Sequence, residues 1–140
     1  MHNQPLVESG NRNQSQSARD LAALQGSWEQ VCLEADGVSN PPDAHSAPGA
    51  LTTFAGERFE VRTVDGTLLL AGTFTLDAST RPTSITWIDS MGEDMGRPLP
   101  AIYKLEGDNF VFVAANEGAP RPCIFKTTQG ETMRVFVRRR

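Results

Sequence analysis

Short apolar runs separated by turn residues make up the chain from about residue 26 onward. Within several runs apolar side chains recur at every second position, as at Ile85 and Trp87 or at Phe110 and Phe112. This period of two places them on one face of a β-strand. The pattern predicts strands at residues 27–35, 51–54, 58–63, 67–76, 84–89, 101–105, 109–114, 123–127 and 132–138.

The connections between these runs are rich in turn residues. Asp36-Gly37 and Asp65-Gly66 lie between apolar runs, and Asp-Gly is a hairpin signal because primed turns require a positive φ. Gly72, in the middle of a predicted strand, would allow the sharp bend that a small barrel requires. Regular short strands with tight turns predict an all-β meander that closes as a barrel or folds as a sandwich.

The chain before the first strand has a different character. Residues 1–17 are polar and rich in Asn, Gln and Ser, which predicts a disordered segment followed by one domain at 18–140. Residues 17–25 are a helix candidate whose Leu21 and Leu24 share one face, enough to plug an apolar opening. Ser17 is the expected N-cap.

Composition narrows the class of protein. The chain has 140 residues, 39% of them hydrophobic and 21% charged, with a net charge of −4. A chain of this length can bury a core without a disulfide or a metal. The acidic balance argues against nucleic acid as a partner. We expect no membrane span and no signal peptide, and therefore a cytoplasmic protein that is a monomer or a weak homo-oligomer.

Cysteine and histidine content limits the chemistry further. Cys32 and Cys123 are far apart and form no C-x-x-C motif, so we expect buried free thiols, with one long-range disulfide as the second interpretation. His2 and His45 are the only histidines, and His45 lies near Asp43 in a Pro-rich loop. We predict no metal site, no cofactor and no catalytic residues, because nucleophile, base and orienter must occur together.

Several sequence pieces resemble the lipocalin-like, or calycin, superfamily and, more closely, a family of small uncharacterised bacterial domains first catalogued in planctomycetes. The resemblance runs from Leu21 to Arg138 and rests on the order and spacing of its pieces. These are residues 24–28 (with Gly26-Ser27-Trp28), 51–59, 72–77, 82–85 and 102–108, Arg121-Pro122 with Phe125, and 135–138.

The resemblance implies an antiparallel eight-stranded up-and-down barrel with a short N-terminal helix. In this family the tryptophan of Gly-x-Trp packs at the closed end, and a basic residue of the last strand lies across its indole. Gly26, Trp28 and Arg138 would fill these roles, with Arg134 as the alternative basic residue. Such a cation–π contact is worth about 1 kcal/mol. The family implies no established activity.

A ligand cavity is the first candidate site. An eight-stranded barrel is either filled by its side chains or holds one small ligand, and both interpretations are open. Arg121 either binds an anion at the barrel mouth or bridges to Asp108 or Glu117 and pins a loop. Phe54 and Phe59 could also line the cavity, and the candidate ligand-binding residues are Phe74, Trp87, Tyr103, Phe110, Phe112 and Arg121.

One acidic loop is a further candidate. It contains Asp89, Glu93 and Asp94 with Met91 and Met95, and its spacing does not match a calcium-binding EF-hand. A solvated loop is the first interpretation, and a contact with another protein is the second, since methionine adapts to partners.

These observations predict a non-enzymatic binding module for a small apolar or amphipathic ligand. The alternative is a protein-binding module, such as an immunity or inhibitor protein that neutralises a toxin or enzyme. A filled interior would favour the alternative, and an open cavity would favour the ligand. A buried Arg or Glu facing such a cavity would reopen an enzymatic role.

Overall fold

The computed structural model describes residues 16–42 and 47–140. Residues 16–24 form a short helix, and the remainder is built from β-strands and their connections. The strands are β1 (Gly26–Ala35), β2 (Val38–Asn40), β3 (Leu51–Ala55), β4 (Arg58–Arg62), β5 (Leu68–Asp77), β6 (Ser84–Asp89), β7 (Pro98–Glu106), β8 (Asn109–Ala115) and β9 (Glu131–Arg139).

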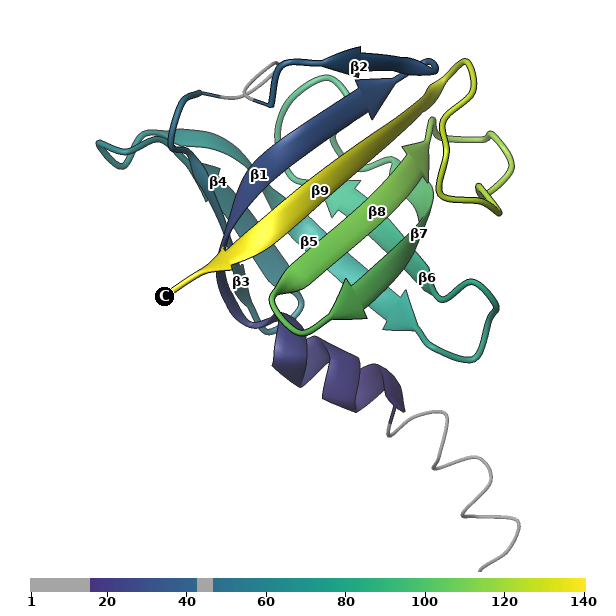
Figure 1. Ribbon diagram of the computed structural model, residues 1–140, viewed down its shortest axis with the longest axis horizontal. Coiled ribbons are helices and arrows are strands. Elements are labelled where there is room, and N and C mark those ends of the chain that lie inside the picture. Colours follow the sequence, from purple (N-terminus) through teal and green to yellow (C-terminus); the bar gives the residue numbers. More distant parts are fainter. Residues whose placement is uncertain (1–15, 43–46) are drawn as a thin grey trace, which may run out of the picture.

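The strands form one closed antiparallel barrel (Figure 1). β1 is followed around the barrel by β3 to β9 in sequence order, and β9 pairs with β1 to close it. β2 stands outside the ring and pairs with β1 only. The predicted fold class, an antiparallel eight-stranded barrel with a short N-terminal helix, is confirmed.

β1 serves two parts of the sheet because it is long. Its first half pairs with β3 and its second half with β2, while β9 follows it along both halves. The register with β9 shifts between Gln30 and Cys32, which marks a bulge. Beyond the bulge Cys32 is exposed, and Leu33 is fully buried.

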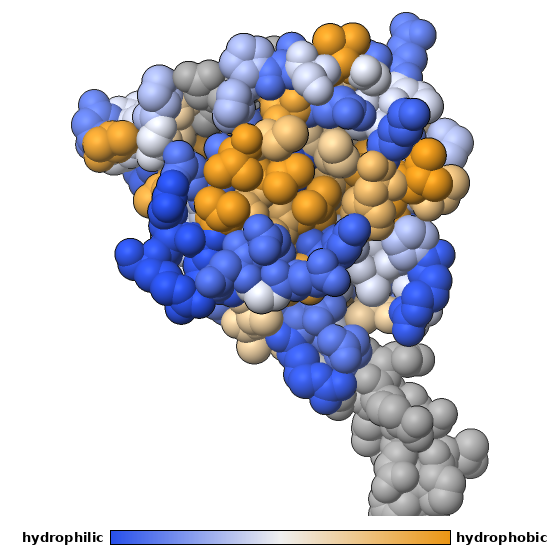
Figure 2. Space-filling model, in the orientation of Figure 1, coloured by the Kyte–Doolittle hydropathy of each residue, from blue (hydrophilic) through white to orange (hydrophobic). Residues whose placement is uncertain are grey.

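The middle of the outer surface of β1, β9 and β8 is apolar. Cys32, Val135 and Val111 lie side by side in the register of these strands, and Met133 continues the patch along β9. Val31 is 39% exposed beside them. Figure 2 shows hydrophobic side chains gathered over these three strands. We call these five residues the outer apolar face.

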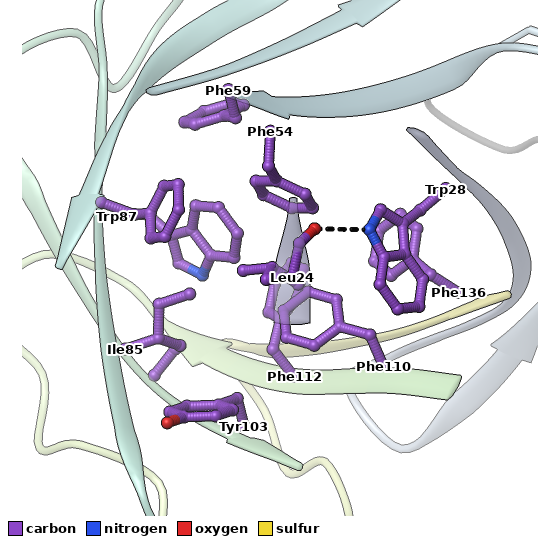
Figure 3. Close-up of a cluster of buried hydrophobic side chains, with 12 residues drawn as sticks. Leu24, Trp28, Phe54, Phe59, Ile85, Trp87, Tyr103, Phe110, Phe112 and Phe136 are labelled. Atoms are coloured by element: carbon purple, nitrogen blue, oxygen red, sulfur yellow. Dashed lines mark hydrogen bonds between the residues drawn. The ribbon is translucent and has the colours of Figure 1, made fainter. Parts of the chain in front are cut away.

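Aromatic side chains fill the barrel interior from the helix end up to the floor of the opposite end (Figure 3). Leu24 of the helix is 1% exposed and packs into this cluster, with Leu21 against it, so the two leucines plug the barrel as predicted. Most ring pairs meet edge to face or tilted, the arrangements that aromatic pairs favour, and Phe112 stacks on Phe136. The buried cluster is Leu24, Trp28, Phe54, Phe59, Phe74, Ile85, Trp87, Ala101, Tyr103, Phe110, Phe112 and Phe136.

Gly72 lies where β5 approaches its neighbours too closely for any side chain. A Cβ at this position would lie 2.3 Å from the carbonyl oxygen of Ile88 and 2.8 Å from the Phe59 ring. The glycine predicted to allow a bend therefore permits a close contact between strands of the barrel wall.

Two predicted elements differ from the structure. Residues 123–127 form no strand: they belong to a long connection between β8 and β9 that lies on the outside of the barrel. Ile102 and Val113 lie on outward-facing positions and are nevertheless buried; the connection contacts this part of β7, where Arg121 bonds to the Ala101 carbonyl and Lys104 lies over the Phe125 ring. β2 was not predicted, since three residues without apolar alternation carry no strand signal.

The N-terminal predictions need small corrections. Residues 16 and 17 are helical, so the predicted disordered segment 1–17 is wrong at its end, and its first 15 residues lie outside the described part. Ser17 does not cap the helix: its hydroxyl accepts a hydrogen bond from the Ala78 amide, 2.9 Å away. This bond ties the helix to the β5–β6 connection.

The cysteines also differ from prediction. Cys32 and Cys123 are free, but both are exposed rather than buried, one on the outer apolar face and one in the long connection. Neither of the two described ranges contains a helix long and apolar enough to cross a membrane.

Candidate functional site: a cavity at the open end of the barrel

The helix end of the barrel is closed by Trp28 and Arg138. Trp28 is fully buried, and its indole nitrogen donates to the carbonyl of Leu24 at 2.7 Å. The Arg138 guanidinium lies 4.3 Å from the centre of the indole ring, so Arg138 occupies the stacking position and Arg134 does not. Arg138 also donates to the carbonyls of Ala23 and Gln25 in the segment that joins helix and barrel.

Gly26 permits this arrangement through its backbone. Its φ is 109°, in the region that side chains disfavour, and a Cβ there would lie 3.6 Å from the Arg138 guanidinium. Tyr103 adds a second tie, since its hydroxyl donates to the Asp20 carboxylate of the helix at 2.5 Å. Burial, together with this bond to Asp20, raises the pKa of Tyr103, so it remains protonated.

The opposite end of the barrel contains a cavity of about 410 Å³. The connections β4–β5, β6–β7 and β8–β9 surround its mouth. The lining residues are Thr52, Phe54, Phe59, Val61, Leu69, Leu70, Trp87, Asp89, Asp94, Leu99, Phe112, Ala114, Ala115, Asn116, Thr132, Arg134 and Phe136.

Aromatic rings form the floor and one wall of this cavity. The Trp87 ring lies 5.2 Å from that of Phe59 and 4.8 Å from that of Phe112, measured between centroids. Trp87 is 6% exposed, and its indole nitrogen has no hydrogen-bond partner among the described residues. A buried donor without a partner is costly, so this ring contrasts with the fully bonded Trp28.

Arg134 brings a positive charge into the cavity. On β9, Thr132, Arg134 and Phe136 point inward by strand alternation, and all three line the cavity. The Arg134 guanidinium donates to the Gln30 side chain at 2.8 Å. Burial lowers the pKa of Arg134, although the guanidinium remains charged.

Asp89 brings a negative charge to the same cavity. It ends β6, and its backbone carbonyl accepts a bond from the Gly96 amide at 2.8 Å, which folds the 90–97 loop back. Burial raises the pKa of Asp89, Asp94 raises it further, and Arg134 partly opposes both effects. Within the described chain Asp89 and Arg134 form no ion pair.

The structure separates the predicted ligand-binding residues into two groups. Trp87 and Phe112 line the cavity, together with Phe54 and Phe59. Phe74, Phe110 and Tyr103 do not line it, because they belong to the packed half of the interior. Sequence alternation gives the inward face of a strand but not the depth at which packing ends.

Arg121 pins a loop, as one of its two predicted roles has it, but through other partners than Asp108 or Glu117. Its guanidinium donates to the carbonyls of Ile85 at 2.9 Å and Ala101 at 2.7 Å, and to the hydroxyl of Thr86 at 2.9 Å. It therefore fastens the long connection to the outside of β6 and β7.

Arg134 and Asp89 were not predicted as a pair within a site. The signal for Arg134 was its even spacing from Phe136 and Arg138, which places all three on the inward face. Nothing in the sequence shows that Asp89 approaches it, because β6 and β9 meet only through closure of the barrel.

The acidic loop contributes to this site without forming a metal site. Asp89 and Asp94 line the cavity, and Met95 is 61% exposed beside them. The described residues include no cluster of three or more potential metal ligands. His45 and Asp43 lie outside the described residues.

Comparisons of the chain with models of protein families, with curated proteins and with solved structures find no match. The lipocalin-like resemblance therefore stays a prediction, and the functional argument rests on the site itself.

Proposed function

We propose that this barrel binds a small amphipathic ligand in the cavity at its open end. The observation that carries the proposal is a cavity of about 410 Å³ whose walls are aromatic and whose mouth holds Arg134 and Asp89. Ligand sites in proteins span about 300–1,000 Å³ and combine apolar walls with a few polar groups.

The packed half of the barrel supports this proposal by making the cavity a stable feature. Trp28, Phe110 and Leu24 are 0–1% exposed beneath it, so the cavity floor rests on a filled core. A ligand body could cover the Trp87 and Phe112 rings without rearranging the barrel. Preformed walls of this kind lower the entropic cost of binding.

Catalysis is not proposed, although Arg134 meets the condition that would reopen it. Covalent or acid–base chemistry needs a nucleophile or base together with an orienting partner. The lining side chains that could act as a base or a nucleophile are those of Asp89, Asp94, Thr52 and Thr132, and among the described residues no hydrogen bond joins either hydroxyl to either carboxylate. Binding uses the groups that are present.

A neutral fluorescent probe tests the proposal. N-phenyl-1-naphthylamine has an apolar body and no charge, and we expect it to bind in the cavity with enhanced emission. Ala114→Phe places a ring into the cavity and should weaken probe binding at least about tenfold. Ala55→Phe, at an exposed position of β3, is the matched control and should leave affinity unchanged.

Melting curves of both variants show that each is folded before affinity is compared. If Ala114→Phe binds the probe as tightly as the unmodified chain does, the cavity is not the binding site. The proposal is then wrong.

The outer apolar face favours a second function, a protein-binding module such as an immunity or inhibitor protein. Its residues lie on two β-strands and the bulge of a third, where exposed apolar area is a common mark of protein contact. Val135→Glu places a charge within it, and Thr73→Glu does so on the exposed outer side of β5 as a control.

Native mass spectrometry of the protein gently isolated from its own host separates the two functions. A small-molecule adduct lost on denaturation supports the cavity. A stoichiometric protein complex that Val135→Glu abolishes and Thr73→Glu retains supports the outer face.

A further inference from the structure

We infer that the cavity ligand is a zwitterionic amphiphile, in which an anionic group pairs with Arg134, a neighbouring cationic group pairs with Asp89, and an apolar body covers the aromatic wall. This inference rests on the proposed function and specifies the chemical class of the ligand. The simplest molecules of this class are apolar α-amino acids.

Arg134 is fixed in position and has unused donors. A guanidinium carries five N–H donors. One nitrogen of Arg134 donates to the Gln30 oxygen, and the structure gives no other bond from this group to a described residue. Gln30 is itself held by its amide, which donates to the carbonyl of Pro42 at 2.5 Å. The remaining donors are suited to the two oxygens of a carboxylate.

Asp89 is an acceptor without a donor. No described side chain or amide donates a hydrogen bond to its carboxylate, although burial disfavours its charged form. An ammonium group in the cavity would supply both donors and a compensating charge. Its neighbour Asp94 also lines the cavity and adds negative charge on the same side.

The two charged side chains act on each other electrostatically but form no ion pair within the described chain. A carboxylate ligand alone would pair with Arg134 but face the repulsion of Asp89 and Asp94. An amine alone would pair with Asp89 but face Arg134. A ligand head group that carries both charges pairs with both Arg134 and Asp89, so neither buried charge is left unpaired.

The aromatic wall defines the remainder of the ligand. Phe59, Trp87 and Phe112 present adjoining rings below the charged pair. Rings packed against rings in tilted geometry gain beyond their area of contact, which favours an aromatic or branched apolar body.

Isothermal titration calorimetry with three matched compounds tests this inference. Phenylalanine carries both charges, 3-phenylpropionate lacks the ammonium group, and phenethylamine lacks the carboxylate. We expect phenylalanine to bind at least about tenfold more tightly than either of the others, because each charge-assisted contact is worth about this factor.

Two single variants assign the groups. Arg134→Gln should reduce phenylalanine binding to the level of phenethylamine, and Asp89→Asn should reduce it to the level of 3-phenylpropionate. Both variants should still bind N-phenyl-1-naphthylamine, which has no charged group. Arg97→Gln, on an exposed side chain of the same loop, is the control and should change none of these affinities.

The outcomes distinguish the inference from the proposed function. If phenylalanine binds no more tightly than the singly charged compounds while the neutral probe still binds, the zwitterion inference is overturned and the cavity stands. If phenylalanine is preferred but neither variant alters that preference, the assignment to Arg134 and Asp89 is overturned. If no compound binds and the neutral probe also fails, the proposed function falls with it.

Discussion

The two ends of the barrel use the same residue types for opposite purposes. Each end holds one tryptophan and one arginine that face the interior: Trp28 and Arg138 at the helix end, Trp87 and Arg134 at the open end. Arg138 and Arg134 lie on the same face of the same strand, four residues apart. At the closed end the Trp28 nitrogen and the Arg138 guanidinium both donate to backbone carbonyls, whereas at the open end the Trp87 nitrogen has no partner among the described residues.

The difference shows how one barrel can have a tightly bonded closed end and a cavity at its open end. At the closed end the chain itself supplies the acceptors, through the carbonyls of Ala23, Leu24 and Gln25. At the open end no helix of the described residues covers the interior, so the cavity groups are not bonded to such an element. Stability and the proposed binding would thereby fall to different layers of the same barrel.

The largest expected effect comes from removing the closed-end tryptophan. Trp28→Ala should lower the free energy of unfolding by about 3–5 kcal/mol, since a fully buried ring leaves a cavity. Leu99→Ala, at the half-buried wall of the open end, should cost only about 1 kcal/mol. Urea unfolding measures both, and a loss below about 1 kcal/mol for Trp28→Ala would mean that Trp28 does not close the barrel.

The two arginines give the most direct comparison. Arg138→Gln should cost about 2 kcal/mol, because it removes the stack on Trp28 and the charge-assisted bonds to backbone carbonyls. Arg134→Gln should change stability by less than about 0.5 kcal/mol or raise it slightly, because it removes a desolvated charge that forms no ion pair with a described residue. Equal losses in thermal or urea unfolding would contradict the proposed division of roles.

Substitution of Thr127 tests how the long connection at the cavity mouth is fastened. Its hydroxyl donates to Glu34 at 2.5 Å and accepts from the Gly37 amide at 2.8 Å, which fastens the long connection to the β1–β2 turn. Thr127→Val should cost about 1 kcal/mol through the unpaired Gly37 amide. Faster hydrogen exchange at Gly37, with unchanged exchange at Trp28, would localise the effect to the open end.

The same substitution has a predicted pH signature. The Thr127 side-chain bond, followed by its backbone amide, lowers the pKa of Glu34. A lowered folded-state pKa stabilises the protein above the ordinary value, and this contribution is lost as pH falls through the lowered one. Thr127→Val should therefore flatten stability against pH over that window, and unchanged acid unfolding would argue against the Glu34 contact.

Asp89→Asn should give a small effect of the opposite sign. Because burial raises its folded-state pKa, the folded protein binds a proton more tightly, so stability falls as pH rises through that value. Asp89→Asn should stabilise the protein by about 0.5 kcal/mol at neutral pH, discounted for solvent at the mouth, and the gain should vanish at acid pH.

Asp108→Asn is the matched control at the closed end. Asp108 accepts bonds from Arg138 and Arg140, so the same change there should destabilise the protein. If both variants shifted stability in the same direction in parallel pH-dependent melts, the contrast between the ends would be lost.

The sequence alone was sufficient for the class of fold. Period-two alternation, Asp-Gly turns and the position of Gly72 depend on local stereochemistry, and these features predicted most of the strands. The plug formed by Leu21 and Leu24 was also readable, since both lie on one helical face. Residues 123–127 misled because an apolar run bounded by Pro122 and polar residues carries the same local signal as a strand.

Tertiary structure alone decided which residues share a site. Arg134 and Asp89 lie 45 positions apart, and only closure of the barrel brings β6 and β9 to a common interior. It also fixed where packing ends, leaving Phe74 and Phe110 in the core and Phe59 and Phe112 on a cavity wall. Local sequence determines which face of a strand a side chain occupies, but the space opposite that face is set by chains distant in sequence.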